Sequence, residues 1–446
     1  MNGSKHIAIS GAGLVGSLLS IYLINRGYQV SVFERRSDMR KNTLEGGRSI
    51  NLALSNRGLR ALDEVGLADE IRKVAIPMHG RIMHDPAGVL SFLPYGTEGQ
   101  FINSVSRSAL NIVLMNKAEA LGVDFHFDHR ITKVDFENTT MSLAEGPSIK
   151  ELKFDLIIGA DGAFSAVRSA FQITDRFNYA QDYIDHGYKE LHIPPGMAGA
   201  FQLEKNALHI WPRESFMMIA LPNPDGSFTC TLFFPFEGSP SFSHLKTDAE
   251  VSMFFDNTFP DAVRLMPTLL EDYNANPTSS LVTVRCHPWV KNNTLLIGDA
   301  AHAIVPFFGQ GMNAGFEDCR ILNDLLTMHN DNWQAVLSHF QNTRKKDADA
   351  IAQLALDNFI EMRDLVADAD FLLRKKIEAR LHQLYPTQWI PLYSMVTFHD
   401  SMPYSVAYET GLKQKKIMDE VMKRNEIERA WESLDFKAIA DSLKQA

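Results

Sequence analysis

Cysteine is scarce in this sequence of 446 residues, which contains only Cys230, Cys286 and Cys319. Three widely separated thiols form neither a disulfide framework nor a zinc cluster, so we expect a reducing compartment. Basic residues are also in deficit, with 44 Lys and Arg against 54 Asp and Glu and a net charge of −10. Because nucleic-acid binders carry a basic surface, we expect no nucleic-acid partner.

A long hydrophobic run is missing as well. Residues 7–25 carry no charge, but three glycines, three serines and Asn25 interrupt the stretch, and a membrane span needs about 20 predominantly apolar residues. Residues 412–446 are rich in charge, with apolar residues near helical spacing, which predicts one amphipathic surface helix. We therefore expect a soluble, cytoplasmic protein with no membrane contact.

The length predicts two or three structural units, and the N-terminal pattern indicates how the first begins. A strand at His6–Ser10, a helix that ends at Arg26 and a strand at Val30–Phe33 form a β-α-β unit. Further elements are expected as a helix at Asn56–Val65, a hairpin of Arg81–His84 and Val89–Phe92, a helix capped by Ser106 that runs through Leu121, and strands at Val123–Phe127, Ile131–Phe136 and Leu152–Ile158.

The central part of the sequence has a different character. Four short strand-like runs, many of them aromatic and separated by Pro or Gly turns, predict an antiparallel sheet at Tyr188–Ile193, Ala207–Trp211, Phe216–Leu221 and Phe228–Phe234. Thr294–Ile297 then resembles a buried parallel strand, and the chain from Gly311 onward is expected to be mainly helical. The first domain is therefore discontinuous, because the sheet interrupts it.

The first chemical signal is the glycine-rich turn between the first strand and the first helix. Gly11, Gly13 and Gly16 fit the dinucleotide-binding pattern, in which small residues let backbone N–H groups approach a pyrophosphate. Glu34 ends the second strand, where it can accept hydrogen bonds from a ribose diol. The same carboxylate would repel a 2′-phosphate, so this pattern favours FAD or NAD over NADP.

Two later motifs again join an apolar strand to a helix start. Gly159–Arg168 contains Asp161, which is either a ligand of the nucleotide or an ordinary N-cap residue. Leu295–His302 contains Asp299, which can hold a ribityl hydroxyl, and the following helix start near Gly311 can direct backbone donors at an anionic ring. We interpret His302 as a structural histidine. The sequence has no H-E-x-x-H, G-x-S-x-G or P-loop motif.

The three motifs, in this order and at these distances, resemble the FAD-dependent aromatic hydroxylases. The resemblance implies bound FAD, with NADPH and O₂ as co-substrates and no second nucleotide fingerprint. Four stretches outside the flavin motifs sharpen the resemblance to members that hydroxylate L-kynurenine in tryptophan degradation and NAD biosynthesis, namely residues 47–54, 186–191, 208–212 and 391–398.

The implied fold is α/β, with a Rossmann-like FAD-binding domain, an inserted antiparallel β-sheet substrate domain and a helical C-terminal region. The expected FAD-binding domain comprises residues 1–80, 100–185 and 285–380. The substrate-side sheet comprises 81–99 and 186–284, and the helical region comprises 381–446.

The resemblance also assigns site residues beyond the glycines and acids already named. Arg81, Tyr95, Asn358 and Tyr393 match substrate contacts; without the resemblance, Arg81 would be a solvated hairpin charge and the tyrosines packing residues. Pro306, Phe307 and Phe308 are expected to wall the flavin, and no side chain is expected to be catalytic. The full cofactor set is Gly11, Gly13, Val15, Gly16, Phe33, Glu34, Arg35, Arg36, Ala53, Arg107, Ile131, Asp161, Asp299, Gly311, Met312 and Asn313.

The implied chemistry suits these substrate residues. An Arg fork and a phenol hydroxyl suit the carboxylate of kynurenine, and an Asn carbonyl or second phenol can receive its ammonium group. NADPH would reduce FAD, and a flavin C4a-hydroperoxide would then transfer oxygen to the ring, which gives 3-hydroxy-L-kynurenine. Two alternatives stay open: a hydroxylase of another aromatic amine or phenol, and a binding protein that keeps the FAD fold without catalysis. The sequence predicts no oligomeric state.

Overall fold

The first layer of the fold is a six-stranded, largely parallel sheet. The structure is a computed structural model that describes residues 5–41, 51–362 and 369–444. The strand order of this sheet is β18-β19-β12-β1-β2-β8. All neighbours pair in parallel except β18 at the edge. The strands are β1 (His6–Ser10), β2 (Gln29–Phe33), β8 (Asp124–His126), β12 (Leu156–Gly159), β18 (Val290–Lys291) and β19 (Thr294–Leu296).

The register of this sheet brings the sequence motifs to one edge. Ser10 lies opposite both Phe33 and Gly159, and Gly159 lies opposite Leu296. Because all four strands point the same way, the segments that follow them leave the sheet side by side. The glycine turn, Glu34, Asp161 and Asp299 therefore come together at the carboxyl ends of the strands.

The helices around this sheet confirm the expected β-α-β unit. The first helix, α1 (Leu14–Asn25), is almost entirely buried and packs against α4 (Arg107–Ala120) and α10 (Gly311–Met328). The Ser106 side chain accepts a hydrogen bond from the Ala109 N–H, so it caps α4 as predicted. Shorter helices in this part are α2 (Asn56–Asp63), α3 (Ala68–Val74), α5 (Ala166–Gln172) and α9 (Asp299–His302).

The second layer is a seven-stranded sheet with the order β17-β13-β16-β15-β14-β5-β6. The predicted hairpin joins this sheet because β5 pairs in parallel with β14. One face packs against α6 (Asp248–Thr258), α7 (Pro260–Val263) and α8 (Leu269–Ala275). The strands are β5 (Gly80–His84), β6 (Leu90–Pro94), β13 (Asn178–Ile193), β14 (Ala207–Arg213), β15 (Phe216–Pro222), β16 (Phe228–Pro235) and β17 (Ser279–His287).

Two three-stranded sheets complete the β structure, and one corrects a sequence prediction. The expected single strand Leu152–Ile158 is two strands, since β11 (Ser148–Lys153) ends before β12 begins. The backbone N–H of Phe154 bonds to Thr139 and that of Asp155 to His6, so the chain changes sheets there. Strand β11 pairs with β10 (Thr140–Glu145) and β9 (Arg130–Asp135); the other sheet holds β3 (Asn51–Leu54), β7 (Ile102–Ser106) and β4 (Ile76–Met78).

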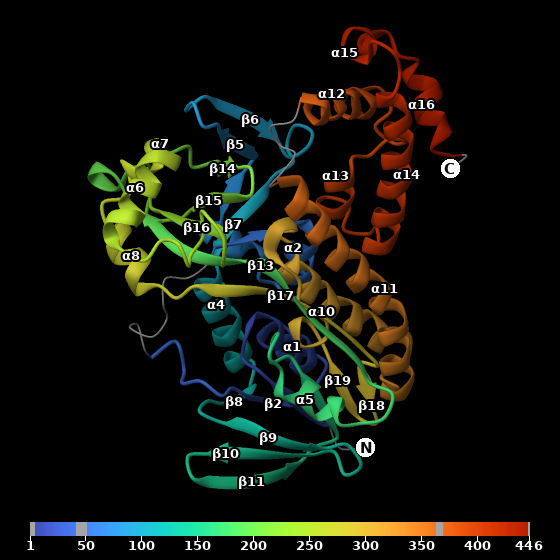
Figure 1. Cartoon of the computed structure of the whole chain (residues 1–446). Coiled ribbons are helices and arrows are strands. Elements are labelled where there is room, and N and C mark those ends of the chain that lie inside the picture. The colour runs from blue at the N-terminus through green and yellow to red at the C-terminus, as the bar shows by residue number, and fades with distance from the viewer. Residues whose placement is uncertain (1–4, 42–50, 363–368, 445–446) are drawn as a thin grey trace.

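The C-terminal part is helical, as predicted, and lies along one side of the molecule in orange and red (Figure 1). The single amphipathic helix expected over residues 412–446 is wrong: the chain there forms parts of three helices that share one small apolar core. No helix within the described ranges is long and apolar enough to cross a membrane. The helices are α11 (Trp333–Ile360), α12 (Ala369–Leu384), α13 (Leu392–Thr397), α14 (Tyr404–Met422), α15 (Ile427–Ala430) and α16 (Phe436–Ser442).

Candidate active site

A cavity of about 690 Å³ lies between the two large sheets. At one end it is lined by the loops that leave the carboxyl edge of the six-stranded sheet, including Gly11, Glu34, Asp161 and Asp299. At the other end it is lined by the hairpin, one face of the seven-stranded sheet and Tyr393 of α13. The cavity is therefore elongated between a motif-built end and a sheet-built end.

The three glycines of the first turn have different tasks. Gly11 has φ +100°, and a Cβ there would lie 2.6 Å from the carbonyl oxygen of Ala160. A Cβ on Gly16 would lie 2.0 Å from the carbonyl oxygen of Gly11, so this glycine permits the turn to pack on α1. A Cβ on Gly13 would meet no protein atom within 4 Å, and Gly13 lines the cavity. The open space beside Gly13 fits a pyrophosphate at the N-terminus of α1.

Glu34 is held in place by backbone donors at the end of β2. Its carboxylate accepts hydrogen bonds from the backbone N–H of Ala12 at 3.1 Å and of Arg36 at 3.0 Å. The exposed side chains of Arg35 and Arg36 flank it at the cavity wall. The arrangement fixes an acidic acceptor beside the glycine turn, where a ribose diol would lie.

Asp161 contacts the start of α5, whose N-cap residue is Ser165, and its role as a nucleotide ligand stays a prediction. One carboxylate oxygen accepts hydrogen bonds from the backbone N–H groups of Ala166 at 2.8 Å and Val167 at 3.2 Å at the start of α5. The other oxygen is buried and has no hydrogen-bond partner among the described residues. Burial raises the pKa of Asp161. A donor from a bound ligand would satisfy this oxygen, as a nucleotide hydroxyl can.

The third motif presents an acid and a helix N-terminus. Asp299 exposes its side chain at the cavity, and the surrounding protein raises its pKa by desolvation. Gly311 and Met312 open α10 at the cavity wall, and the Gln310 side chain does not cap the helix. The first N–H groups of an 18-residue helix therefore stay available to an anionic ring edge. Arg168 donates to the Ala300 carbonyl at 2.9 Å and so joins the second motif to the third.

The sheet-built end gathers a guanidinium and two phenols. The Arg81 guanidinium lies 5.3 Å from the ring centre of Tyr95 and 4.9 Å from that of Tyr393. The two tyrosine rings stack at 5.3 Å, and Phe308 stacks on Tyr393 at 5.5 Å. Nε of Arg81 and the hydroxyl of Tyr95 are buried without hydrogen-bond partners in the described chain. An acidic ligand group between these two residues would give both buried donors an acceptor.

Electrostatics at this end keep the guanidinium charged and the phenols neutral. Burial disfavours the charged form of Arg81, but the electrostatic effects of Tyr393, Tyr95 and Glu361 are larger. Together they raise the pKa of Arg81. Desolvation raises the pKa of both Tyr95 and Tyr393. The Arg81 guanidinium is therefore charged beside two neutral phenols, which suits a carboxylate ligand.

The remaining wall of the cavity is apolar, and sequence reasoning missed most of it. Pro306, Phe307 and Phe308 line the cavity at the predicted place. Along the strands of the seven-stranded sheet, side chains that line the cavity alternate with side chains that do not. This alternation in the sequence could have identified the face of the sheet that lines the cavity. The residues that line the cavity from this sheet are Tyr188, Leu208, Met217, Ile219, Leu221, Thr231, Phe233 and Leu281.

Three predicted site residues lie one layer behind the wall. Gly16 packs on the turn, as described above, and the Asn313 side chain is fully buried, where it bonds to the backbone of Ala53, Ser55 and Gly309. Asn358 donates to the Phe307 carbonyl at 2.6 Å and does not line the cavity, and its expected substrate contact stays a prediction. The other predicted residues all line the cavity: Gly11, Gly13, Val15, Phe33, Glu34, Arg35, Arg36, Ala53, Arg107, Ile131, Asp161, Asp299, Gly311, Met312, Arg81, Tyr95 and Tyr393.

One other sequence expectation, the structural role of His302, has a clear outcome. His302 is structural, since its Nε2 lies 2.6 Å from Asp318 inside a buried polar cluster. Residues 47–50 of one resemblance stretch lie outside the described residues. No cluster of metal-ligating side chains occurs in the described ranges.

The fold and the site together define a flavoprotein of the aromatic hydroxylase class. The sequence profile of the FAD binding domain family matches residues 5–355. A solved 2-methyl-3-hydroxypyridine-5-carboxylic acid oxygenase superposes with a TM-score of 0.69, at 20% identity, over 84% of this chain and 96% of that chain. A solved p-nitrophenol 4-monooxygenase from Pseudomonas putida superposes with a TM-score of 0.67, at 18% identity, over 93% of this chain and 98% of that chain. These two structures support the fold alone.

Sequence relatives narrow the class. The chain is 49% identical to a kynurenine 3-monooxygenase from Christiangramia forsetii, over 99% of both chains. It is 46% identical to a kynurenine 3-monooxygenase from Dictyostelium discoideum, over 99% of this chain and 97% of the relative. The chain belongs to the FAD binding domain family and, within it, to the kynurenine 3-monooxygenases.

Proposed function

We infer that the chain is an FAD-dependent monooxygenase that converts L-kynurenine to 3-hydroxy-L-kynurenine with NADPH and O₂. The observation that supports kynurenine as the substrate is the convergence of Arg81 and Tyr95, whose Nε and hydroxyl have no hydrogen-bond partner among the described residues. Kynurenine is an aromatic amine with an amino acid end, so its carboxylate supplies the acceptor that these donors lack.

The motif-built end of the cavity fits FAD and is called the flavin end below. The space beside Gly13 would take the pyrophosphate, Glu34 a ribose diol, and Asp161 and Asp299 hydroxyl groups of the cofactor. Backbone N–H groups at Gly311 and Met312 would stabilise negative charge on the reduced ring. Bound FAD, once reduced by NADPH, supplies the activation of O₂ that the hydroxylation needs.

At the sheet-built end, called the substrate end below, the chain's own residues orient the substrate. Arg81 and Tyr95 hold the carboxylate, and Tyr393 offers a hydroxyl oxygen to the ammonium group. Because Asn358 supports the Phe307 carbonyl from behind, it acts on the wall and leaves the ammonium group to Tyr393. The aromatic ring of the substrate then lies against Phe307, Phe308 and the apolar sheet face, which exclude water.

The test is NADPH oxidation by the FAD-loaded enzyme with and without L-kynurenine, with the product identified by mass. We expect kynurenine to stimulate NADPH oxidation and 3-hydroxykynurenine to form in proportion to the NADPH that is oxidised. Stimulation by another aromatic amine or phenol, with no response to kynurenine, would support the other hydroxylase. A colourless protein that binds no FAD when it is added would support the binding-protein alternative.

We further propose a cytoplasmic location. Support comes from the three isolated cysteines, all of which are buried as free thiols, and burial raises the pKa of Cys286 to about 12. Thiols of this kind are suited to a reducing compartment. Fractionation of cells that express the chain, with activity measured in each fraction, tests this proposal.

A further inference from the structure

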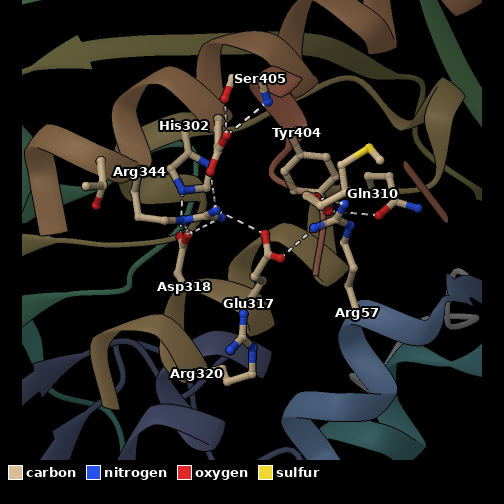
Figure 2. A network of polar contacts seen from close by, with 12 residues as sticks. Arg57, His302, Gln310, Glu317, Asp318, Arg320, Arg344, Tyr404 and Ser405 are labelled. Carbon is tan, nitrogen blue, oxygen red and sulfur yellow. Dashed lines mark hydrogen bonds and ion pairs between the residues drawn. The ribbon is translucent and has the colours of Figure 1, made fainter. Parts of the chain in front are cut away.

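A buried polar network links Arg57, Glu317, Asp318 and Arg344 with Tyr404 and Gln310 (Figure 2). Its centre is formed by Arg57 of α2, Glu317 and Asp318 of α10 and Arg344 of α11, none of which is more than 3% exposed. The Arg57 and Glu317 side chains lie 2.6 Å apart, and Arg344 contacts Glu317 at 3.0 Å and Asp318 at 2.8 Å. The hydroxylation chemistry uses none of these four charges.

Arg57 reaches from this network to α13, the helix that carries Tyr393. Its Nε donates to the Val396 carbonyl at 2.8 Å, and its Nη2 donates to the carbonyls of His399 at 3.2 Å and of Met402. The neighbouring Asn56 donates to the Phe398 carbonyl at 3.3 Å. The start of α2 therefore supplies the hydrogen-bond donors for the C-terminal end of α13.

Helix α13 depends on such external donors because it is short. It spans six residues, Leu392–Thr397, and the last four carbonyls of any helix lack partners within it. Tyr393 is on its first turn and contributes its ring to the stack with Tyr95 and Phe308. Arg81, Tyr95 and Tyr393 form the substrate clamp, and a shift of α13 would move Tyr393 relative to Arg81 and Tyr95.

The same arginine also reaches the flavin end. The Arg57 guanidinium lies 4.0 Å from the ring centre of Tyr404, and the Tyr404 hydroxyl donates to Gln310 Oε1 at 2.9 Å. Gln310 is the N-cap residue of α10, which opens toward the flavin end. Farther along the network, Asp318 accepts from the Gly298 N–H at 3.2 Å, immediately before Asp299.

We propose that Arg57 is a positioning residue that fixes the distance between the substrate clamp and the flavin, and so sets how much NADPH oxidation leads to hydroxylation. The proposal rests on the proposed function. In the coupled reaction NADPH, H⁺, O₂ and kynurenine give NADP⁺, water and the hydroxylated product. When the clamp is displaced, NADPH, H⁺ and O₂ give NADP⁺ and H₂O₂, and kynurenine is left unchanged.

The variant Arg57→Lys tests this role because it keeps the charge but has only three donors on one nitrogen, whereas the planar Arg57 guanidinium reaches four acceptors. Arg213→Lys is the matched control: Arg213 donates to the carbonyls of Thr258, His84 and Pro212, away from the cavity. Asn56→Ala is a milder second variant, since Asn56 is exposed and loses one bond to Phe398. The measurements are amide hydrogen exchange over residues 391–402, the kynurenine KM, and product formed per NADPH oxidised.

For Arg57→Lys we expect exchange over 391–402 to rise about tenfold, the kynurenine KM to rise about tenfold and much of the NADPH to yield H₂O₂, as expected for the loss of charge-assisted bonds. FAD content and kcat for NADPH oxidation should stay near those of the wild type. Arg213→Lys should change none of these, and Asn56→Ala should shift them in the same direction by a smaller factor. If Arg57→Lys does not fold, Asn56→Ala decides.

The proposal is overturned if the deciding variant keeps the exchange rate, KM and product yield of the wild type, or if Arg213→Lys changes them equally. Failure of the proposed function has a different signature. In that case the wild type makes no 3-hydroxykynurenine, while the exchange measurement still reports whether Arg57 holds α13.

Discussion

The two ends of the cavity are built in different ways. The flavin end is made by loops that follow adjacent strands of one parallel sheet, whose register places Ser10, Phe33, Gly159 and Leu296 in one row. The substrate end is made by side chains from a hairpin, a separate sheet and a C-terminal helix. The flavin end presents backbone N–H groups together with three carboxylates, whereas the substrate end presents side chains alone.

This difference explains how each end should respond to mutation. A backbone site depends on the absence of side chains, so adding one methyl group is enough to damage it. A side-chain site depends on a few polar atoms held in apolar surroundings, so removing one charge should abolish recognition with little damage to the fold.

The largest effect is expected at the glycine turn. Gly16→Ala places a Cβ 2.0 Å from the Gly11 carbonyl oxygen, so we expect loss of both FAD and folded protein. Gly13→Ala places its Cβ in open space, so the apoprotein should keep its free energy of unfolding while FAD affinity falls by at least about tenfold. Urea unfolding of the apoproteins and FAD titration followed by flavin fluorescence measure the two effects.

The pair of glycine variants also tests the interpretation of the cavity. If Gly13→Ala binds FAD as the wild type does, the space beside Gly13 is not the pyrophosphate site. If Gly13→Ala unfolds as readily as Gly16→Ala, the two glycines have the same structural task, and the distinction drawn between them is wrong.

The next largest effect is expected at the substrate end. Arg81→Met removes a buried guanidinium whose Nε has no partner, so the substrate-free holoenzyme should lose no thermal stability. Kynurenine binding should weaken by the free energy of a charge-assisted hydrogen bond, about 1.5–3 kcal/mol, which is roughly a tenfold to hundredfold loss of affinity. Thermal melting with and without kynurenine measures both quantities on one sample.

FAD retention is the internal control for Arg81→Met, because the two ends are separate. An unchanged kynurenine affinity would reject Arg81 as the carboxylate ligand. A loss of FAD from the same variant would show that the ends are not independent.

The contrast between the ends also explains which features could be predicted from the sequence. The glycine turn, Glu34, Asp161 and Asp299 each follow a strand, so local pattern and strand register were enough to assemble them. The positions of Arg81 and Tyr393 required a family resemblance, since 312 residues separate them and only tertiary packing brings them together.

The placements that sequence reasoning did not supply have the same physical origin. Asn358 has the polarity of a ligand, but the structure uses it to hold the Phe307 carbonyl. Arg57, Glu317 and Arg344 sit among other helical charges in the sequence, and only their burial shows that they form one network. Sequence pattern indicates that a residue is polar or charged, whereas packing decides which partner it meets.

A smaller effect is expected from Asp161→Asn, which changes one side chain at the backbone-built end. The amide oxygen can still cap α5, but an NH₂ group replaces the unpartnered oxygen at the cavity. Since burial already raises the pKa of this carboxyl, its removal should leave the apoprotein at least as stable. FAD affinity should fall by about 1–2 kcal/mol, measured by FAD titration, and an unchanged affinity would restrict Asp161 to capping.

The smallest effect should be confined to the sheet that carries the substrate end. On that sheet His209 Nε2 lies 2.9 Å from the Glu204 carbonyl and its Nδ1 lies 2.9 Å from His84 Nε2. If Nε2 donates to Glu204, Nδ1 must accept from His84, so a second proton on His209 would face a donor. His84 Nδ1 in turn contacts Asp261 at 2.7 Å. Burial lowers the pKa of His209 from 6.5 to about 4.

Because its pKa is lowered in the folded state, His209 makes the protein less stable as the pH falls. The unfolded chain binds a proton near pH 6.5 and the folded chain only near pH 4, so stability is fully present above pH 6.5 and is lost as the pH falls through this window. We expect acidification to reduce the free energy of unfolding by about 1–2 kcal/mol more in the wild type than in His209→Gln. Urea unfolding at several pH values measures this, and parallel pH profiles would show that His209 titrates normally.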